Sequence, residues 1–251
     1  MESFKAALIN EIEKMYKKKK MTVILIISVT VIVIGKLISL GFSNFGIGGT
    51  FNVSAASPIS VLSVLANTLL PLFTALVASD LFSGEFSHNT MKISLTRPIS
   101  RFKLFSAKVA AIAFFVLANL LIVMFLSTIV GLICNFSSIT FISIIRIIVS
   151  YLVTLLPIMV LALIVVFFSN IFKSSSAVFF IFAMFYIVSY VMGTVFQPFS
   201  GLFITSMLNW HTLWIADTML LSKISREFLI MLGYGIMFFT AGYYLFDKRD
   251  L

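Results

Sequence analysis

The sequence predicts an all-α membrane protein with six transmembrane helices and both termini in the cytoplasm. Three observations lead to this fold class: the composition, the length of the apolar stretches and the placement of the basic residues. Of the 251 residues, 61% are hydrophobic and 11% are charged, against about 25% charged in an average soluble domain. Such a chain lacks the polar surface of a soluble enzyme, a disordered protein or a secreted domain held by disulfides. Its single cysteine also excludes an internal disulfide.

Six apolar stretches are long enough to cross a bilayer, whose hydrocarbon core of about 30 Å needs a helix of about 20 residues. The run from Val109 to Val130 is apolar on every side, whereas a membrane β-barrel would show short segments of alternating polarity. No repeat and no low-complexity linker divides the chain, so we predict a single domain over 1–251. The predicted spans are 22–40, 61–79, 109–133, 142–168, 177–196 and 228–246.

The basic residues determine the predicted orientation. Fourteen of the 18 Lys and Arg side chains fall before the first span, between the second and third, after the fourth or after the sixth. The positive-inside rule then places both termini in the cytoplasm. The net charge of +9 is explained by this topology, and no basic patch with interleaved aromatics indicates nucleic acid. The lipid bilayer is therefore an expected partner, and nucleic acid is not.

Residues 2–16 show an apolar residue at each helical turn. The apolar positions are Phe4, Leu8, Ile12 and Met15, and Glu11, Glu13 and Lys14 are predicted to lie on the other faces. This spacing predicts an amphipathic helix in the cytoplasmic interface, followed by an anchoring run at 17–20. A short solvated tail is the alternative.

Segment 80–108 is too long for a tight turn between two spans. Met91 and Leu95 suit a short helix, Pro98 breaks it, and Ser100 can cap a new helix leading into the third span. We predict a helix at the membrane surface on which a cytoplasmic partner docks. The alternative is a basic loop without a partner.

The residues of this segment carry a resemblance to a known family. The matching positions are Glu85, Thr90, Leu95, Pro98, Ser100, Arg101 and Lys108. Their spacing resembles the signature of permeases from type-2 class ABC exporters, in which an acidic residue is followed by Gly-Thr, Leu, Pro-x-Ser-Arg and Lys. Asn89 stands where the family usually has Gly, and Asn tolerates the left-handed backbone that such a turn requires.

The resemblance implies that the chain is the permease subunit of an ATP-driven exporter in the bacterial plasma membrane. It would form half of the pathway, beside a second permease chain, identical or related. Two copies of a separate ABC ATPase would bind ATP and Mg, with no cofactor in this chain. A coupling helix near 87–97 would sit in a groove of the ATPase, with Glu85 stabilising the turn beside it. The implied ATPase-coupling residues are Glu85, Asn89, Thr90, Met91, Leu95, Pro98 and Arg101.

Segment 197–227 is too apolar for an ordinary loop and too interrupted for a span. Trp210 and Trp214 are one helical turn apart and suit the interfacial belt. The resemblance implies a re-entrant helical hairpin acting as an external gate, and an amphipathic surface helix without gating is the alternative. His211 lacks a companion ligand, so we expect an interfacial histidine rather than a metal site. Arg146, the deepest charge, either snorkels or contacts the pathway.

The motifs that the sequence lacks narrow the function further. There is no G-x-x-x-x-G-K-[ST] loop, H-E-x-x-H, Cys pair or G-x-S-x-G, so no enzyme activity is expected. All nine acidic residues are placed outside the spans or at their ends, which argues against a secondary carrier. A non-transporting scaffold or sensor subunit is the other alternative.

Two further features concern the cargo and the helices. The 28 Phe and 12 Met residues suit a hydrophobic or amphipathic cargo, such as a peptide antibiotic, toxin or drug, although lipid-facing side chains explain them equally well. Pro71 and Pro157 fall inside the second and fourth predicted spans. Each removes a backbone donor and is predicted to kink its helix.

Overall fold

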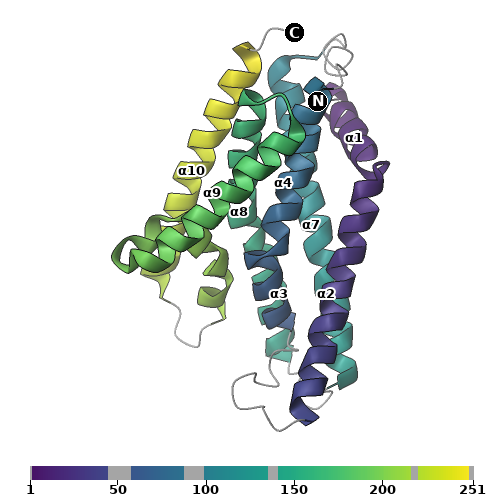
Figure 1. The fold of residues 1–251 in the computed structure, drawn as a ribbon, viewed down its shortest axis with the longest axis vertical. Helices are drawn as coiled ribbons and strands as arrows, with labels where there is room; N and C mark the ends of the chain where they lie inside the picture. Colours follow the sequence, from purple (N-terminus) through teal and green to yellow (C-terminus); the bar gives the residue numbers. More distant parts are fainter. Residues whose placement is uncertain (1, 45–57, 88–98, 135–140, 216–219, 249–251) are drawn as a thin grey trace.

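The computed structural model describes residues 2–44, 58–87, 99–134, 141–215 and 220–248, and every element in these ranges is a helix. Figure 1 shows α1 and the last turns of α10 at the same end of the bundle. The elements are α1 (Glu2–Tyr16), α2 (Lys19–Asn44), α3 (Pro58–Asn67), α4 (Leu69–Leu81), α5 (Ser83–Ser87), α7 (Arg101–Cys134), α8 (Phe141–Ile171), α9 (Ser175–Val195), the 3₁₀ helices η3 (Gln197–Leu202) and η4 (Ile204–Trp214), and α10 (Leu221–Lys248).

Five helical stretches in the described part of the chain are long and apolar enough to cross a membrane, which supports a multi-pass membrane protein. They are Leu69–Ser87, Arg101–Ile133, Ile142–Ile171, Ser175–Val195 and Leu221–Lys248. The first predicted span, 22–40, falls within α2, whose side chains beyond Val33 lie outside the described part. The prediction of an all-helical membrane protein is confirmed, and the count of six spans stays a prediction.

The second predicted span, 61–79, is not one continuous helix. The chain breaks at Thr68 between α3 and α4, and the span-length stretch is Leu69–Ser87. The cause is Pro71, which has no N–H to donate to the carbonyl of Asn67 one turn earlier. That carbonyl instead accepts a hydrogen bond from the hydroxyl of Tyr186 in α9, at 2.7 Å. Pro157, by contrast, lies within an unbroken α8.

The segment 197–227 also differs from its prediction. Residues 197–214 form two 3₁₀ helices, and 221–227 belong to α10, which begins seven residues before the predicted span at 228. Figure 1 shows η3 and η4 folded back against the bundle between α9 and α10, and η4 contacts α3, α8, α9 and α10. Residues 221–227, which were predicted to lie outside the sixth span, are therefore part of helix α10.

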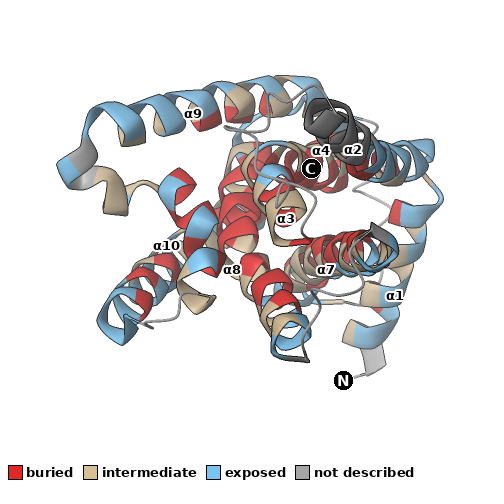
Figure 2. Cartoon of the chain, turned by 90° about the horizontal axis from the view of Figure 1, so that it is seen from below, coloured by how far each residue is buried: buried red, intermediate tan, exposed pale blue. Residues whose placement is uncertain are grey.

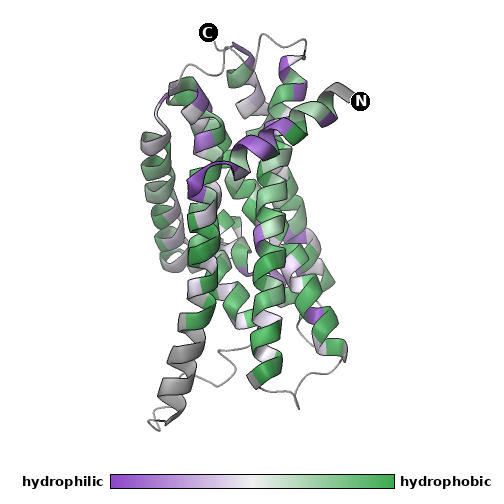
Figure 3. Cartoon of the chain, turned by 90° about the vertical axis from the view of Figure 1, so that its right-hand side faces the viewer, coloured by the Kyte–Doolittle hydropathy of each residue, from purple (hydrophilic) through white to green (hydrophobic). Residues whose placement is uncertain are grey.

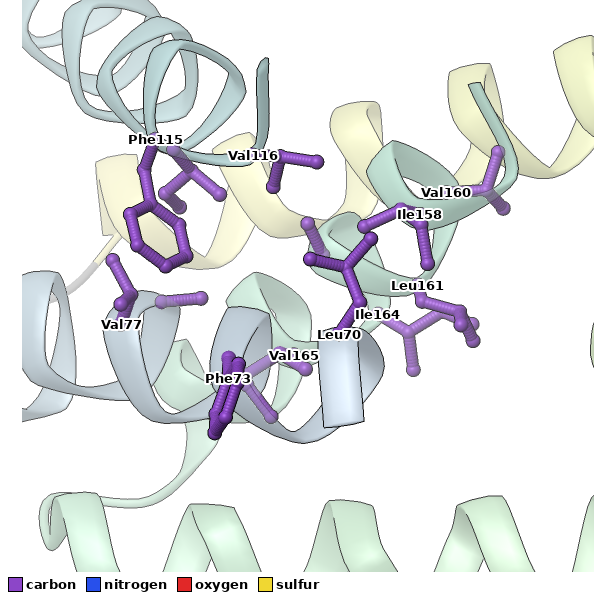
Figure 4. Close-up of a cluster of buried hydrophobic side chains, with 14 of the residues drawn as sticks. Leu70, Phe73, Val77, Phe115, Val116, Ile158, Val160, Leu161, Ile164 and Val165 are labelled. Carbon is purple, nitrogen blue, oxygen red and sulfur yellow. The ribbon is translucent and has the colours of Figure 1, made fainter. Parts of the chain in front are cut away.

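Helix α8 lies at the centre of the bundle (Figure 2) and contacts α4, α7, α9, α10 and η4. Its core-facing side chains interlock with those of α4 and α7, as Figure 4 shows. The labelled residues of this cluster are Leu70, Phe73, Val77, Phe115, Val116, Ile158, Val160, Leu161, Ile164 and Val165. Full burial of side chains of this size stabilises by about 1.5–3 kcal/mol each in water. In lipid the same interlocking acts through close packing.

The end of the bundle that holds α1, called the polar end below, contains most of the ionisable residues, and a smaller group lies at the start of α10. Figure 3 shows hydrophilic positions on α1 and at the adjoining helix ends, with hydrophobic helices beyond them. Helices α9 and α10 bury little of their apolar surface within this chain, since 22% and 11% of their most apolar windows are buried. The polar end is thus the place to look for ionisable groups, and α9 and α10 present apolar surface outward.

Candidate functional site

Glu85 begins the stretch 85–101 that contains the predicted coupling residues. It is buried in α5, with 8% of its surface exposed. Arg101 is the first residue of α7. The structure therefore fixes both ends of the segment. The other predicted coupling residues, Asn89, Thr90, Met91, Leu95 and Pro98, lie outside the described residues, as does most of the predicted helix 87–97.

Helix α5 is attached to the end of α8 through Ser83. The buried Ser83 hydroxyl lies 2.9 Å from the carbonyl oxygens of both Ser169 and Phe172. Carbonyls in the last turn of a helix are open to donors from outside that helix, and the Ser83 hydroxyl donates to this pair. The same turn packs through Phe82, whose ring makes edge contacts with Phe105 and Phe246. The position of Glu85 is therefore set by α8 and α10 as well as by α4.

Lys108 of α7 is the centre of a buried ion cluster. Its side chain has no exposed surface, and its ammonium lies 2.8 Å from Glu11 Oε2 and 2.8 Å from Glu85 Oε2. It also donates to the carbonyl of Leu81, at 3.0 Å. Lys14 completes the cluster at 3.1 Å from Glu11 Oε1 and 3.4 Å from Glu85 Oε1.

Two ammonium groups and two carboxylates balance in this cluster, which is the condition for burying charge at all. Burial raises the pKa of Glu11, but Lys108 and Lys14 outweigh burial, so the pKa lies below its ordinary value. Burial lowers the pKa of Lys14, but Glu11 and Glu85 outweigh it, so the pKa lies above its ordinary value. Both groups are therefore charged near neutral pH.

The cluster corrects the predicted orientation of the N-terminal helix. Glu11, predicted to lie on a polar face, is 1% exposed and points into the protein with Ala7 and Met15, as α1 packs against α7. Phe4, Leu8 and Ile12 are only half-buried. The prediction of a helix here is confirmed, but the ion pair with Lys108 rather than the apolar stripe sets which face turns inward. Sequence spacing could not show this, because the partner is 97 residues away.

Two polar contacts hold neighbouring helices to the same end. Asp80 of α4 pairs with Lys20 of α2, whose Nζ lies 2.9 Å from Oδ2. The Arg101 guanidinium donates to the backbone carbonyl of Asp247 near the end of α10. The Ser100 hydroxyl accepts from the N–H of Lys103 at 3.4 Å, so its predicted role as a helix cap is confirmed. The start of α7 is thereby tied to α10.

The predicted gate residues lie partly in the protein interior. Trp210 is 4% exposed, stacks on Phe228 of α10 and makes an edge contact with Trp214. The indole of Trp210 thus faces α10, and its predicted place in the interfacial belt stays a prediction. Arg146 is half-buried in the second turn of α8 and its carbonyl accepts from the Ser150 hydroxyl.

His211 also lies in the interior of the chain. It has no exposed surface, and its Nε2 lies 3.0 Å from the Ser63 hydroxyl of α3 while its Nδ1 lies 3.1 Å from the carbonyl of Leu208. The carbonyl can only accept, so Nδ1 carries a proton and donates to it. Burial lowers the pKa of His211, against a smaller opposing effect of the Leu208 carbonyl. This imidazole joins η4 to α3.

Sequence reasoning missed the ion pairs that join Glu11 and Lys14 to Glu85 and Lys108, and the pair between Asp80 and Lys20. One signal was available for Lys108. An ionisable residue two turns inside a 34-residue apolar helix calls for a partner of opposite charge.

Comparison with known proteins places this arrangement in context. A family model described as ABC-2 family transporter protein matches residues 7–190. This range includes the ion cluster, α8 and most of α9. The chain is also 38% identical over 65 residues to the uncharacterized protein YhcI of Bacillus subtilis (strain 168). That match covers 26% of this chain and 21% of the relative.

Proposed function

We propose a coupling role for segment 85–101, starting from the fact that this chain belongs to the ABC-2 family of transporter proteins. A member of this family is the membrane subunit of an ABC transporter and not its ATPase. Segment 85–101 would transmit the force of a separate ATPase to the helix bundle. The observation that carries this proposal is the attachment of both ends of the segment. Glu85 and Ser83 hold one end, and Arg101 holds the other.

These attachments distribute force over the bundle. Through Glu85 the segment reaches α1 and α7, through Ser83 it reaches α8, and through Arg101 it reaches α10. A buried ion pair resists displacement because moving one partner leaves an uncompensated charge. A push on the connector therefore moves these helices together instead of being absorbed locally. ATP binding to the partner would shift the bundle between inward and outward states through its different affinity for the two.

The orientation and assembly are part of the same proposal. The concentration of Lys and Arg at the polar end supports a cytoplasmic location for that end and for both termini. The chain would form half of a pathway in a bacterial plasma membrane, completed by a second permease chain, identical or related, above two ATPase subunits. The outward apolar faces of α9 and α10 are available to such a neighbour and to lipid.

The proposed direction is export, and the proposed cargo is a hydrophobic or amphipathic peptide, toxin or drug. An open apolar groove of about 360 Å³ between α8 and α10 supports an apolar cargo. It is lined by Leu156, Met159, Val160, Leu163, Met231, Leu232, Gly235, Ile236, Phe239 and Thr240. Survival of cells against a panel of amphipathic peptides, with and without the chain, tests the cargo directly.

The coupling proposal is tested by identifying an ABC ATPase that co-purifies with the chain, reconstituting the two in nanodiscs and measuring stimulated ATP hydrolysis. Glu85→Gln and Leu95→Asp are expected to lower the stimulation at least about tenfold, while the exposed Glu13→Gln leaves it unchanged, since changes away from such contacts have small effects. Glu11→Gln separates coupling from stability, because it disturbs the same ion cluster without flanking the connector.

Two outcomes would contradict the proposal. One is full stimulation in both Glu85→Gln and Leu95→Asp. The other is an equal loss in Glu11→Gln and Glu85→Gln at equal thermal stability, which would mean that the cluster stabilises the fold without transmitting force. Stable binding of the ATPase without transport of any cargo would indicate a scaffold subunit instead.

A further inference from the structure

A second polar site lies at the start of α10, far from the ion cluster. A pocket of about 360 Å³ is formed there between the 3₁₀ helices and the first two turns of α10. Its polar or small lining residues are Ser200, Gly201, Ser206, Lys223, Arg226 and Glu227. The proposed coupling through 85–101 does not involve this pocket, so a result that contradicts one proposal leaves the other unaffected.

The entrance to the pocket is strongly positive. Lys223 and Arg226 are exposed in the first two turns of α10, and no acidic residue lies in its first turn. The N-terminus of a helix carries a partial positive charge and favours anions. Two cationic side chains in the first two turns add to this positive charge instead of compensating it. The Arg226 guanidinium lies beside η3, since a Cβ on Gly201 would be 3.6 Å from Nη2. This concentration of positive charge suits an anion such as a phosphate.

Glu227 lines the same pocket and gives it a second character. Glu227 is only 8% exposed. No hydrogen bond, and no ion pair within 4.0 Å, joins its carboxylate to any residue that the structure describes. A buried carboxylate without a partner is unfavourable. An external ammonium group would supply both the charge and the hydrogen-bond donors that Glu227 lacks.

Apolar surface continues from the pocket along α10 toward the C-terminal end of that helix. Ile230 belongs to the pocket lining, and Leu232 and Ile236 line the apolar groove between α8 and α10. At about 1.5 Å per residue, this groove begins roughly one turn beyond Glu227. Leu229, next to the pocket, is 66% exposed. A molecule with a charged head and apolar chains would meet its matching surfaces in this order along the helix.

We propose that this pocket binds the headgroup of a phospholipid that carries both a phosphate and a primary ammonium, as phosphatidylethanolamine does. The phosphate lies between Lys223 and Arg226, the ammonium pairs with Glu227, and the acyl chains follow α10 into the apolar groove. Such a lipid fills the charged pocket and covers apolar surface that this chain leaves open.

The test uses the full chain in detergent micelles doped with phosphatidylethanolamine or phosphatidylglycerol, with bound lipid counted by native mass spectrometry. Phosphatidylglycerol keeps the phosphate but lacks the ammonium, so it should bind at least about tenfold more weakly, as expected when a charged hydrogen bond is lost. Glu227→Gln should remove this preference, and Arg226→Met should weaken both lipids. Lys248→Met, at the far end of the same helix, is the matched control and should change neither.

Three results would overturn the proposal. The first is equal retention of both lipids by the unchanged protein. The second is competition by free phosphoethanolamine at the lipid's own concentration, which would assign the pocket to a soluble ligand. The third is unchanged retention in Arg226→Met, a variant at an exposed position whose folding is checked by thermal unfolding. This last variant keeps the test decisive even if Glu227→Gln does not fold.

Discussion

Lys108 and Glu11 form an ion pair of 2.8 Å between Nζ and Oε2, although 97 residues separate them in the sequence and neither side chain is more than 1% exposed. The pair fastens the N-terminal helix α1 to α7. Glu85 shares the same ammonium at 2.8 Å. The helix before the first span and the connector after the second are thus held by one cation.

Replacing that cation tests its structural importance. Lys108→Met should lower the free energy of unfolding by about 3–5 kcal/mol, because Glu11 and Glu85 would be left buried with Lys14 as their nearest cation. Thermal or denaturant unfolding in detergent measures the change. Lys103→Met, at an exposed position of the same helix, should change stability by no more than about 0.5 kcal/mol. Similar losses in the two variants would argue against a buried charge effect.

The dependence of stability on pH should reveal Glu11. Its folded pKa is below the ordinary 4.5, so its contribution is fully present above that value and is lost as the pH falls through the folded pKa. The unchanged protein should therefore lose thermal stability more steeply than Glu11→Gln in this acidic window. Parallel stability curves for the two proteins between neutral and acidic pH would contradict this assignment.

The attachment of α5 to α8 depends on one hydroxyl. Ser83→Ala should cost about 1–3 kcal/mol of stability, because the carbonyls of Ser169 and Phe172 lose the donor that the buried Ser83 side chain provides. Ser87→Ala is the matched control, since Ser87 is an exposed residue whose hydroxyl donates to the carbonyl of Gly84 within its own helix. Melting temperatures that fall equally in both variants would show that the link to α8 is not the cause.

The break between α3 and α4 is tested with a double-mutant cycle. Tyr186→Phe removes the hydroxyl that bonds to the Asn67 carbonyl and should cost about 1 kcal/mol. In a Pro71→Ala background the new N–H at position 71 can serve that carbonyl, so the same change should cost less. The coupling between the two changes is read from four unfolding curves. Strictly additive effects would mean that the proline does not create the need for the tyrosine.

Some of the fold follows from local sequence alone. The helical character of 109–133, 142–168 and 177–196 was predictable because a backbone in lipid must satisfy its own hydrogen bonds. The break near Pro71 was predictable as a proline effect, but its position at Thr68 and its repair by Tyr186 were not. The early start of α10 at Leu221 was missed because Lys223, Arg226 and Glu227 make its first turns read as a loop.

Composition, apolar length and motif spacing are properties of the amino-acid sequence, and they were enough to predict a helical membrane protein whose most distinctive connector surrounds Glu85. The inward position of Glu11 beside Lys108, the packing of Trp210 on Phe228 and the pocket that Glu227 lines beside two cations came from the folded structure. Buried charges and rings are stabilised by neighbours on other helices, and packing around α8 determines which helices are neighbours.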